Sequence, residues 1–223
     1  MNDLVFMIFK NPFYWIVVVA GILSFFFYKK IVGFFGELWV RLELKKLSDD
    51  YLVINNLMIK NGDRTSQIDH VVVSKYGVFV IETKQYNGYI KGNDYDKNWL
   101  QICGNKRFFI HNPVHQNYGH VMALVKLLNI EESFFISLVC FSSNAKLNIK
   151  SDKVVPIYNL NKKIYNYKNI ILRNYKEIYY YLLSINIVDK KERYNHIKNI
   201  KKKKWHIFVN KSFIVIIINN YCL

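Results

Sequence analysis

The sequence holds few of the residues that break or cross-link a chain. Its 223 residues include only three prolines, nine glycines and three cysteines. Cys103, Cys140 and Cys222 lie far apart, and no two of them form a C-x-x-C pair. This spacing excludes a zinc knuckle, and an odd number of distant thiols indicates no disulfide framework. We therefore expect buried or idle thiols in a reducing, cytosolic environment.

Arginine is also scarce. The formal net charge is +16, yet only five of the 32 basic residues are arginine. A strongly basic protein normally has an anionic partner, such as nucleic acid or an acidic membrane surface. Here the excess is lysine, accompanied by many Asn, Ile and Tyr residues, a bias that an AT-rich genome produces whatever the function. Phosphate-binding surfaces favour the planar arginine fork, so the net charge alone favours a solvated surface over a nucleic-acid site.

One segment lacks charge altogether, from Asn11 to Tyr28. As a helix it would span about 27 Å, close to the thickness of a bilayer's hydrocarbon core. Lys29 and Lys30 follow it, which places the N-terminus outside and the rest of the chain in the cytoplasm. We predict a single-pass anchor in the cell membrane, residues 1–32, with a soluble cytoplasmic domain. A cleaved signal peptide is disfavoured because the basic residues follow the apolar core, and a buried core helix would be shorter or amphipathic.

The rest of the chain alternates between helical and strand patterns, which predicts an α/β (α+β) domain with a mixed β-sheet flanked by helices. We place this domain at residues 33–160, followed by a lysine-rich C-terminal tail at 161–223 that is helical in part. A basic run at 189–205 is read as a solvated face or as a segment against anionic lipid. The expected elements are a linker at 33–36, helices at 36–47 and 111–128 (with Asn112 as N-cap), strands at 51–59, 68–73, 78–83, 87–93, 134–142 and 153–160, and a small hairpin at 94–110 with Gly104 and Asn105 at its turn.

The strands at 68–73 and 78–83 form a predicted hairpin. If Lys75 and Tyr76 make a two-residue turn, the numbers of facing residues add to 151. Asp69 then faces Glu82, and Gln67 faces Lys84. Because side chains alternate along a strand, these four lie on one face of the sheet.

Two facing carboxylates, about 5 Å apart, raise each other's pKa unless a cation lies between them. Mg²⁺ is the natural counter-charge for two carboxylates and a few waters. Lys84 could stabilise a developing anion or position a water, which would equip the site for metal-assisted phosphodiester hydrolysis. An ordinary Glu82–Lys84 pair at an exposed sheet end, with Asp69 in a turn, remains open, as does a register shifted by one.

The spacing D-x12-E-x-K resembles the metal-binding core of the PD-(D/E)xK nuclease superfamily, which has the restriction-endonuclease-like fold. The stretch from Thr65 to Lys84 is most similar to the nuclease-related domain (NERD) family. The resemblance covers residues 33–160 and includes further short matches: Gly36 and Glu37, Tyr86 to Gly88, Trp99 and Gln101, and Asn112, Pro113, Gln116, Asn117 and His120.

The resemblance implies a nuclease that depends on Mg²⁺, with Mn²⁺ as a substitute. It implies that Asp69 and Glu82 bind the metal, that Lys84 assists the attacking water, and that Glu37 is an upstream acid. Gln67 would be an accessory group beside Lys84.

The helix at 111–128 adds candidates at its first turns. Asn117 and His120 precede its core-facing residues by three or four positions, so they continue the buried stripe towards the polar end of the sheet. We assign Gln116 and Asn117 to substrate binding and His120 to catalysis, while a hydrogen-bonded core histidine remains an open alternative for His120.

The leading hypothesis is a membrane-anchored nuclease that acts on DNA, with RNA as a second candidate. Its partners would be nucleic acid, the bilayer around the N-terminal helix, and anionic lipid at the basic tail. A non-catalytic, membrane-tethered module that binds nucleic acid or a protein is the alternative, and a lipid-facing scaffold is a third hypothesis.

Overall fold

The computed structural model describes residues 11–142, 145–196 and 198, except for the side chains of residues 22–30. The predictions for Cys222 and for residues 199–205 of the basic run lie outside this part. The described elements are α2 (Pro12–Leu44), β1 (Tyr51–Asn61), β2 (Arg64–Ser74), β3 (Gly77–Lys84), β4 (Tyr89–Asn93), β5 (Asn98–Cys103), β6 (Lys106–His111), α3 (Pro113–Leu128), β7 (Phe135–Phe141), β8 (Lys146–Lys150), β9 (Val154–Pro156), α4 (Leu160–Tyr165) and α5 (Tyr175–Ser184).

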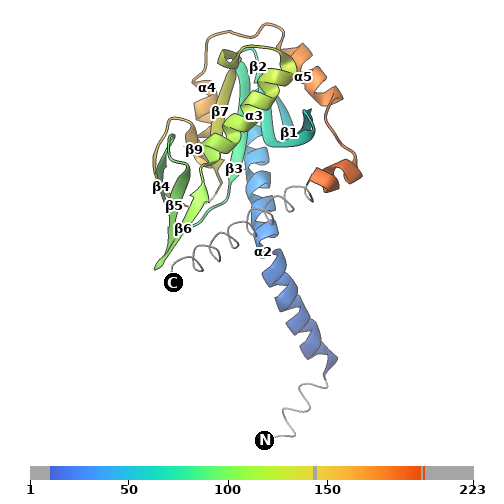
Figure 1. Ribbon diagram of the computed structural model, residues 1–223, viewed down its shortest axis with the longest axis vertical. Coiled ribbons are helices and arrows are strands. Elements are labelled where there is room, and N and C mark those ends of the chain that lie inside the picture. The colour runs from blue at the N-terminus through green and yellow to red at the C-terminus, as the bar shows by residue number, and fades with distance from the viewer. Residues whose placement is uncertain (1–10, 143–144, 197, 199–223) are drawn as a thin grey trace, which may run out of the picture. The chain divides into compact units, whose positions relative to one another are not determined.

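The strands form two sheets, one in the order β1-β2-β3-β7-β9 and one in the order β6-β5-β4-β8. Both are mixed, because β7–β9 and β4–β8 pair in parallel whereas β1–β2 and β4–β5 pair antiparallel. Helices flank the sheets (Figure 1). The predicted α/β class is therefore confirmed, while the finer prediction of a restriction-endonuclease-like core stays a prediction.

The described residues pack into two compact units, and we describe each by itself. Unit 1 comprises Met1–Leu47, Glu82–His115 and Leu138–Asn166, and unit 2 comprises Ser48–Ile81, Gln116–Ser137 and Tyr167–Leu223, each with the exceptions given above. Three of the boundaries fall inside elements, namely β3, α3 and β7. The expected boundaries near residues 32 and 160 stay predictions.

The core of unit 2 lies between the β2–β3 hairpin and two helices. The hairpin contributes alternating valines, among them Val71 and Val80, which are fully buried. Leu124 of α3 and Leu182 of α5 are buried in the same cluster. Each such side chain stabilises the fold by about 1.5–3 kcal/mol, so the helices at 113–128 and 175–184 are held by burial more than by local propensity.

The hairpin register is the predicted one. Ser74 pairs with Gly77, Val71 with Val80, and His70 with Ile81, so each pair of numbers adds to 151. The continuation to Asp69 and Glu82 stays a prediction. The small hairpin is confirmed too, since Cys103 pairs with Lys106 around a turn in which Gly104 has a φ of 57°.

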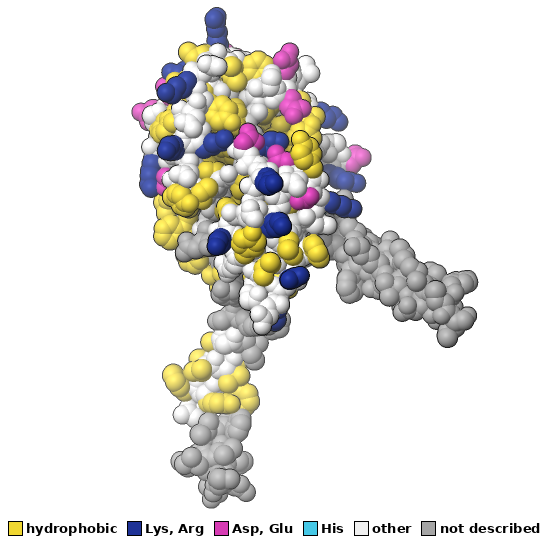
Figure 2. Space-filling model, turned by 90° about the vertical axis from the view of Figure 1, so that its left-hand side faces the viewer, with side chains coloured by type: hydrophobic (Ala, Val, Ile, Leu, Met, Phe, Trp, Pro, Cys, Tyr) yellow, Lys and Arg dark blue, Asp and Glu magenta, His cyan; other side chains and the backbone are white. Residues whose placement is uncertain are grey.

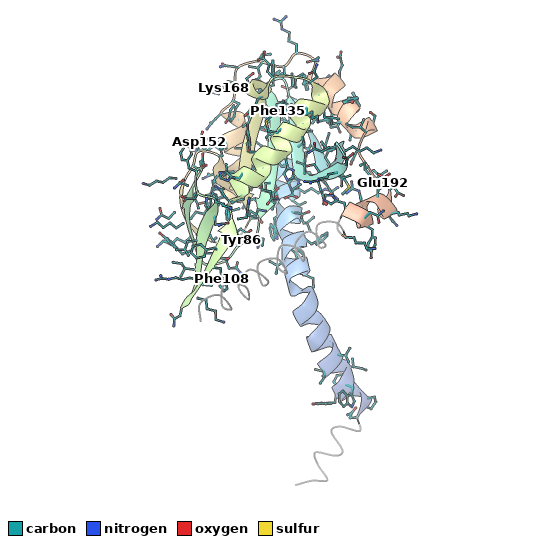
Figure 3. All side chains as sticks on the ribbon, viewed as in Figure 1. Tyr86, Phe108, Phe135, Asp152, Lys168 and Glu192 are labelled. Carbon is teal, nitrogen blue, oxygen red and sulfur yellow. The ribbon has the colours of Figure 1, made fainter. Side chains whose placement is uncertain are left out.

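The core of unit 1 packs against one face of the four-stranded sheet. Trp99 of β5 is fully buried together with Ile90 of β4 and Phe141 of β7. The ring of Tyr86, labelled in Figure 3, lies 6.2 Å from that of Phe141. A Cβ on Gly92 would lie 2.2 Å from Cδ1 of Trp99, so the indole can cover β4 only because this position is glycine.

The linker expected at residues 33–36 is wrong, because α2 continues through it to Leu44. A glycine inside a helix costs about 1 kcal/mol, which burial of the stripe formed by Val40 and Leu44 offsets. Gly36 has another role. A Cβ there would lie 2.8 Å from Oγ of Ser142, so this glycine permits close packing of the helix within unit 1.

The predicted membrane anchor, residues 1–32, overlaps α2 from Pro12 onward. Among the helical residues whose side chains are described, no stretch is long and apolar enough to cross a membrane. The anchor at residues 11–28 stays a prediction.

The segment after residue 160 contains α4 and α5, as expected for a partly helical tail. Cys140 is buried, as predicted, whereas Cys103 is partly exposed. Burial, with a smaller contribution from Glu43, raises the pKa of the Cys140 thiol to about 12.

Arg193, in the basic run, donates hydrogen bonds to the carbonyl oxygens of Ile187 (2.7 Å) and Asn56 (3.0 Å). This part of the run therefore packs within unit 2. Figure 2 shows other Lys and Arg side chains spread among hydrophobic ones over one face.

Candidate active site

An acid and a lysine lie together at the end of β3, in unit 1. Glu82 is only 3% exposed, because it follows five buried residues of β3, near the end of that strand. Nζ of Lys84 donates a hydrogen bond to Oε1 of Glu82 at 2.5 Å. A buried carboxylate is stable only when it is paired, so Lys84 neutralises the charge that the strand carries into the interior.

Glu37 of α2 joins this pair. Val40, one turn further along α2, is buried, so the helix turns the same side towards the core of unit 1. Burial of its carboxyl group and, secondly, the Glu82 carboxylate raise the pKa of Glu37, while Lys84 lowers it. The three predicted residues Glu37, Glu82 and Lys84 therefore interact electrostatically, although Glu37 retains solvent exposure.

A second group of predicted residues lines an open hollow of about 390 Å³ in unit 2. β2 supplies one side of it and α3 another. The lining residues are Thr65, Ser66, Gln67, Asp69, Gln116, His120 and His196. Four of the eight predicted site residues are thus gathered here by tertiary packing.

Two histidines of this hollow are held by hydroxyl groups of β2. Oγ of Ser66 lies 2.9 Å from Nδ1 of His120, and Oγ1 of Thr65 lies 2.5 Å from Nδ1 of His196. Burial, and secondly the neighbouring His120, lower the pKa of His196. No pattern in the sequence indicates His196, which lies in the basic run 131 residues after Thr65.

Gln67 and Asn117 are engaged in protein contacts. Nε2 of Gln67 donates to Oδ1 of Asn56 at 2.9 Å. Asn117 is fully buried, and its amide donates to the carbonyl oxygen of Val80 (2.8 Å) and to Oγ of Ser137 (2.9 Å). Asn117 thus ties α3 to β3 and β7, and its assignment to substrate binding stays a prediction.

The donor chemistry suits Mg²⁺ or Mn²⁺, because Glu82 and Asp69 offer carboxylate oxygens, the ligands that hard divalent cations prefer. Within the ranges that the structure describes, no group of three or more His, Cys, Asp or Glu side chains is arranged to hold a metal ion.

Comparison with known proteins gives a consistent result. Residues 32–142 match the nuclease-related domain, NERD. An uncharacterized protein of Bacillus anthracis is 37% identical over 178 residues, which cover 75% of this chain and 83% of that protein. No solved structure matches the chain.

Proposed function

The chain belongs to the nuclease-related domain family, and on this premise we propose that it is a metal-dependent nuclease that hydrolyses phosphodiester bonds. DNA is the first substrate to test and RNA the second. The observation that carries the proposal is the group of Glu37, Glu82 and Lys84, two acids and a lysine that interact in unit 1. Such perturbed, mutually coupled groups are typical of catalytic sites.

Asp69 and Glu82 would hold Mg²⁺ or Mn²⁺. One further step of the observed register, beyond His70 and Ile81, would set Asp69 opposite Glu82. When bound, the metal would polarise the phosphate and stabilise the developing negative charge. The accessory role of Gln67, beside Lys84, follows from the same extension of the register.

The remaining groups donate, hold or move protons. Lys84 would hold the attacking water or donate a hydrogen bond to a phosphate oxygen as its charge develops. Glu37, whose pKa is raised by burial and by Glu82, is suited to hold and release a proton. In the hollow of unit 2, His120 and Gln116 would donate hydrogen bonds to the phosphate backbone, and Asn117 would act by holding α3 in place.

Cleavage of supercoiled plasmid and of single-stranded DNA by the full-length chain tests this proposal. We expect cutting with Mg²⁺ or Mn²⁺, none in EDTA, and a loss of at least about 100-fold in Asp69→Asn and Lys84→Met. Lys75→Met is the matched control, because it breaks the more exposed ion pair with Asp50, at 2.9 Å. Metal-independent cutting, or cutting that survives in Lys84→Met, would reject the assignment.

The same experiment tests the non-catalytic alternative. Its support is that Lys84 already has a carboxylate partner in the folded protein. Metal-independent binding of DNA without any cleavage by the wild-type chain would favour a nucleic-acid-binding module.

For residues 11–28 we propose a membrane anchor that leaves the following residues in the cytoplasm. Its support is the absence of charge in that stretch and the lysines at 29 and 30. The basic run after residue 189 would then lie near anionic lipid. We expect the wild-type chain to remain with membranes after alkaline extraction and Val17→Lys/Val19→Lys to be released. Trp39→Lys/Leu42→Lys, on exposed positions of the same helix, is the control, and its release as well would contradict the anchor.

A further inference from the structure

The four-stranded sheet of unit 1 has two chemically different faces. One face is packed, since it carries Ile90 and Trp99 into the core together with the partly buried Leu147 and Ile149. Because side chains alternate along a strand, the residues between these belong to the opposite side. We call it the outer face and define it by Tyr89, Lys91 and Asn93 of β4, Asn98, Leu100 and Ile102 of β5, Arg107, Phe109 and His111 of β6, and Lys146, Asn148 and Lys150 of β8.

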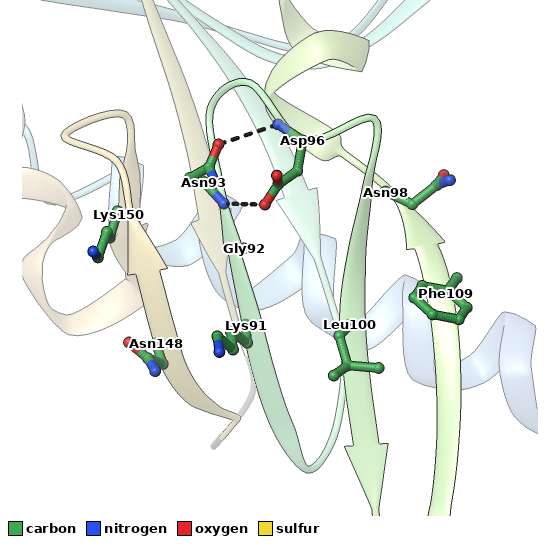
Figure 4. Close-up of a pocket in the computed structure, with 9 residues that line it drawn as sticks. All are labelled: Lys91, Gly92, Asn93, Asp96, Asn98, Leu100, Phe109, Asn148 and Lys150. Atoms are coloured by element: carbon green, nitrogen blue, oxygen red, sulfur yellow. Dashed lines mark hydrogen bonds between the residues drawn. The ribbon is translucent and has the colours of Figure 1, made fainter.

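The strand register sets these side chains in rows. Lys91 pairs with Asn148 on one side and with Leu100 on the other, and Leu100 pairs with Phe109. Figure 4 shows this row crossing the sheet, with Lys150 beyond it on β8. The row lines a hollow of about 590 Å³.

The outer face is cationic. Lys91, Arg107, Lys146 and Lys150 are all exposed, and none of its strand residues is acidic. Asp96 lines the end of the hollow, where its carboxylate accepts a hydrogen bond from the backbone N–H of Asn93. In the part of the chain that the structure describes, the four cations form no ion pairs. Their charge is therefore available to an anionic ligand.

An aromatic ring stands among these cations. Phe109 is 80% exposed, although exposing a phenyl ring to water is unfavourable. Two amide side chains, Asn98 and Asn148, line the hollow with it. Asn148 also donates to the hydroxyl of Tyr89 at 2.6 Å, which places a second ring on the same face.

We propose that the outer face binds single-stranded nucleic acid. Cations along a groove neutralise the phosphates, and an exposed ring stacks on a base, which is the combination that single-strand-binding surfaces use. A duplex would use the cations but could not stack on Phe109, because its bases are already stacked on each other. A lipid surface would use the cations and bury a broader apolar patch, whereas here the exposed ring shares its hollow with Lys, Asn and Asp side chains.

This inference rests on the proposed nuclease function and names its substrate class. Tyr89 follows Lys84 by five residues, so the outer face begins within about 17 Å of the candidate catalytic lysine along the chain. The Tyr89 end of this face therefore belongs to the same unit as the group of Glu37, Glu82 and Lys84 and lies close to it along the chain.

Binding is tested with the full-length chain in neutral detergent and EDTA, which separates binding from cleavage. The probe is a fluorescent oligo-dT of about 16 nucleotides, the upper range for such sites. We expect Phe109→Ala to weaken binding roughly 5- to 150-fold, the equivalent of losing one stacked base. The matched control is Phe108→Ala, which removes the neighbouring ring on the opposite side of β6, because side chains alternate along a strand. This variant should bind like the wild type.

The cations are tested through salt dependence. Lys91→Gln/Lys150→Gln should lower the slope of log K against log salt by about 1.4, since each phosphate contact on a single strand contributes about 0.7. Lys106→Gln/Lys162→Gln removes the same charge from positions outside the outer face and should leave the slope unchanged. Oligo-U of the same length and phosphatidylglycerol nanodiscs serve as the other ligands.

The outcomes separate the two proposals. Equal affinity for duplex and single strand, tighter binding of nanodiscs than of oligonucleotide, or wild-type binding by Phe109→Ala would each overturn this inference. If oligo-dT or oligo-U binds as expected but Mg²⁺ produces no cleavage, the binding face stands and the nuclease proposal fails. If cleavage of single strands proceeds in Phe109→Ala with unchanged KM, the nuclease stands and the binding face fails.

Discussion

Nζ of Lys84 lies 2.5 Å from Oε1 of Glu82, two residues earlier on the same strand. The side chains retain 15% and 4% of their exposure, so neither charge is screened fully by water. Residues two apart share one face of a strand, and this pairing fixes the amine beside the acid. The relationship stabilises the fold and positions a candidate catalytic group.

Removal of this lysine should destabilise the protein. Breaking a buried ion pair leaves a charge without compensation, so Lys84→Met should lower the free energy of unfolding by about 3 kcal/mol. Glu82→Gln/Lys84→Met should lose less, because no buried charge remains. Urea unfolding in EDTA measures both, and Lys75→Met at the more exposed pair should cost less than about 1 kcal/mol. Equal losses in the two single variants would show that Glu82 does not need Lys84.

Replacing each of two glycines of α2 by alanine should change the free energy of unfolding in opposite directions. At Gly36 a Cβ would lie 2.8 Å from Oγ of Ser142 and 3.0 Å from Oε1 of Gln85. Gly36→Ala should therefore destabilise the protein by about 1–3 kcal/mol. At Gly33 nothing lies within 4 Å, so Gly33→Ala should stabilise the helix by about 0.4–1 kcal/mol. Thermal unfolding of the two variants measures both changes, and the same sign in both would contradict the packing described for Gly36.

Titration of the Glu37 carboxyl group should lower the free energy of unfolding as pH rises. Burial and then Glu82 raise its pKa above the ordinary value of 4.5, so the folded protein keeps a proton that the unfolded chain has lost. This contribution is complete below pH 4.5 and is lost as pH rises through the folded pKa. Glu37→Gln should therefore gain stability relative to the wild type at neutral pH, with little difference at about pH 4. Urea unfolding in EDTA at both pH values measures the gain, and a constant difference would rule out titration of Glu37.

Titration of His196 should make the free energy of unfolding rise with pH, the opposite of the effect of Glu37. Its pKa is lowered from 6.5 by burial and then by His120, so the unfolded chain binds a proton more readily than the folded one. Its contribution is complete above pH 6.5 and is lost as pH falls towards the folded pKa. We expect the wild type to lose stability on acidification through this range and His196→Asn to lose less. His120→Asn should remove the smaller part of this loss of stability. Urea unfolding of the wild type and of both variants across the pH range measures the effect. Coinciding profiles for all three proteins would contradict the burial of His196 and its interaction with His120.

The hairpin shows how much of the site could be predicted locally. Its register depends on a two-residue turn and on alternation of valines, both of which are properties of adjacent residues, and the observed pairs add to the predicted 151. The cap of α3 is similar, since Oδ1 of Asn112 accepts from the N–H of Val114 at 2.9 Å. β8 was missed although Leu147 and Ile149 alternate with polar residues, because so short a strand is defined by its parallel partner β4.

Patterns between neighbouring residues determined the elements, the turns and the spacing of Asp69, Glu82 and Lys84, because strand alternation and helix periodicity depend only on nearby positions. The tertiary structure decided which distant residues meet. It continued α2 through Gly33 and Gly36. It also placed Glu37 where the Glu82 carboxylate raises its pKa, and His196 beside Thr65. These arrangements depend on burial and pairing across long stretches of chain, which outweigh the roughly 1 kcal/mol preferences of single residues.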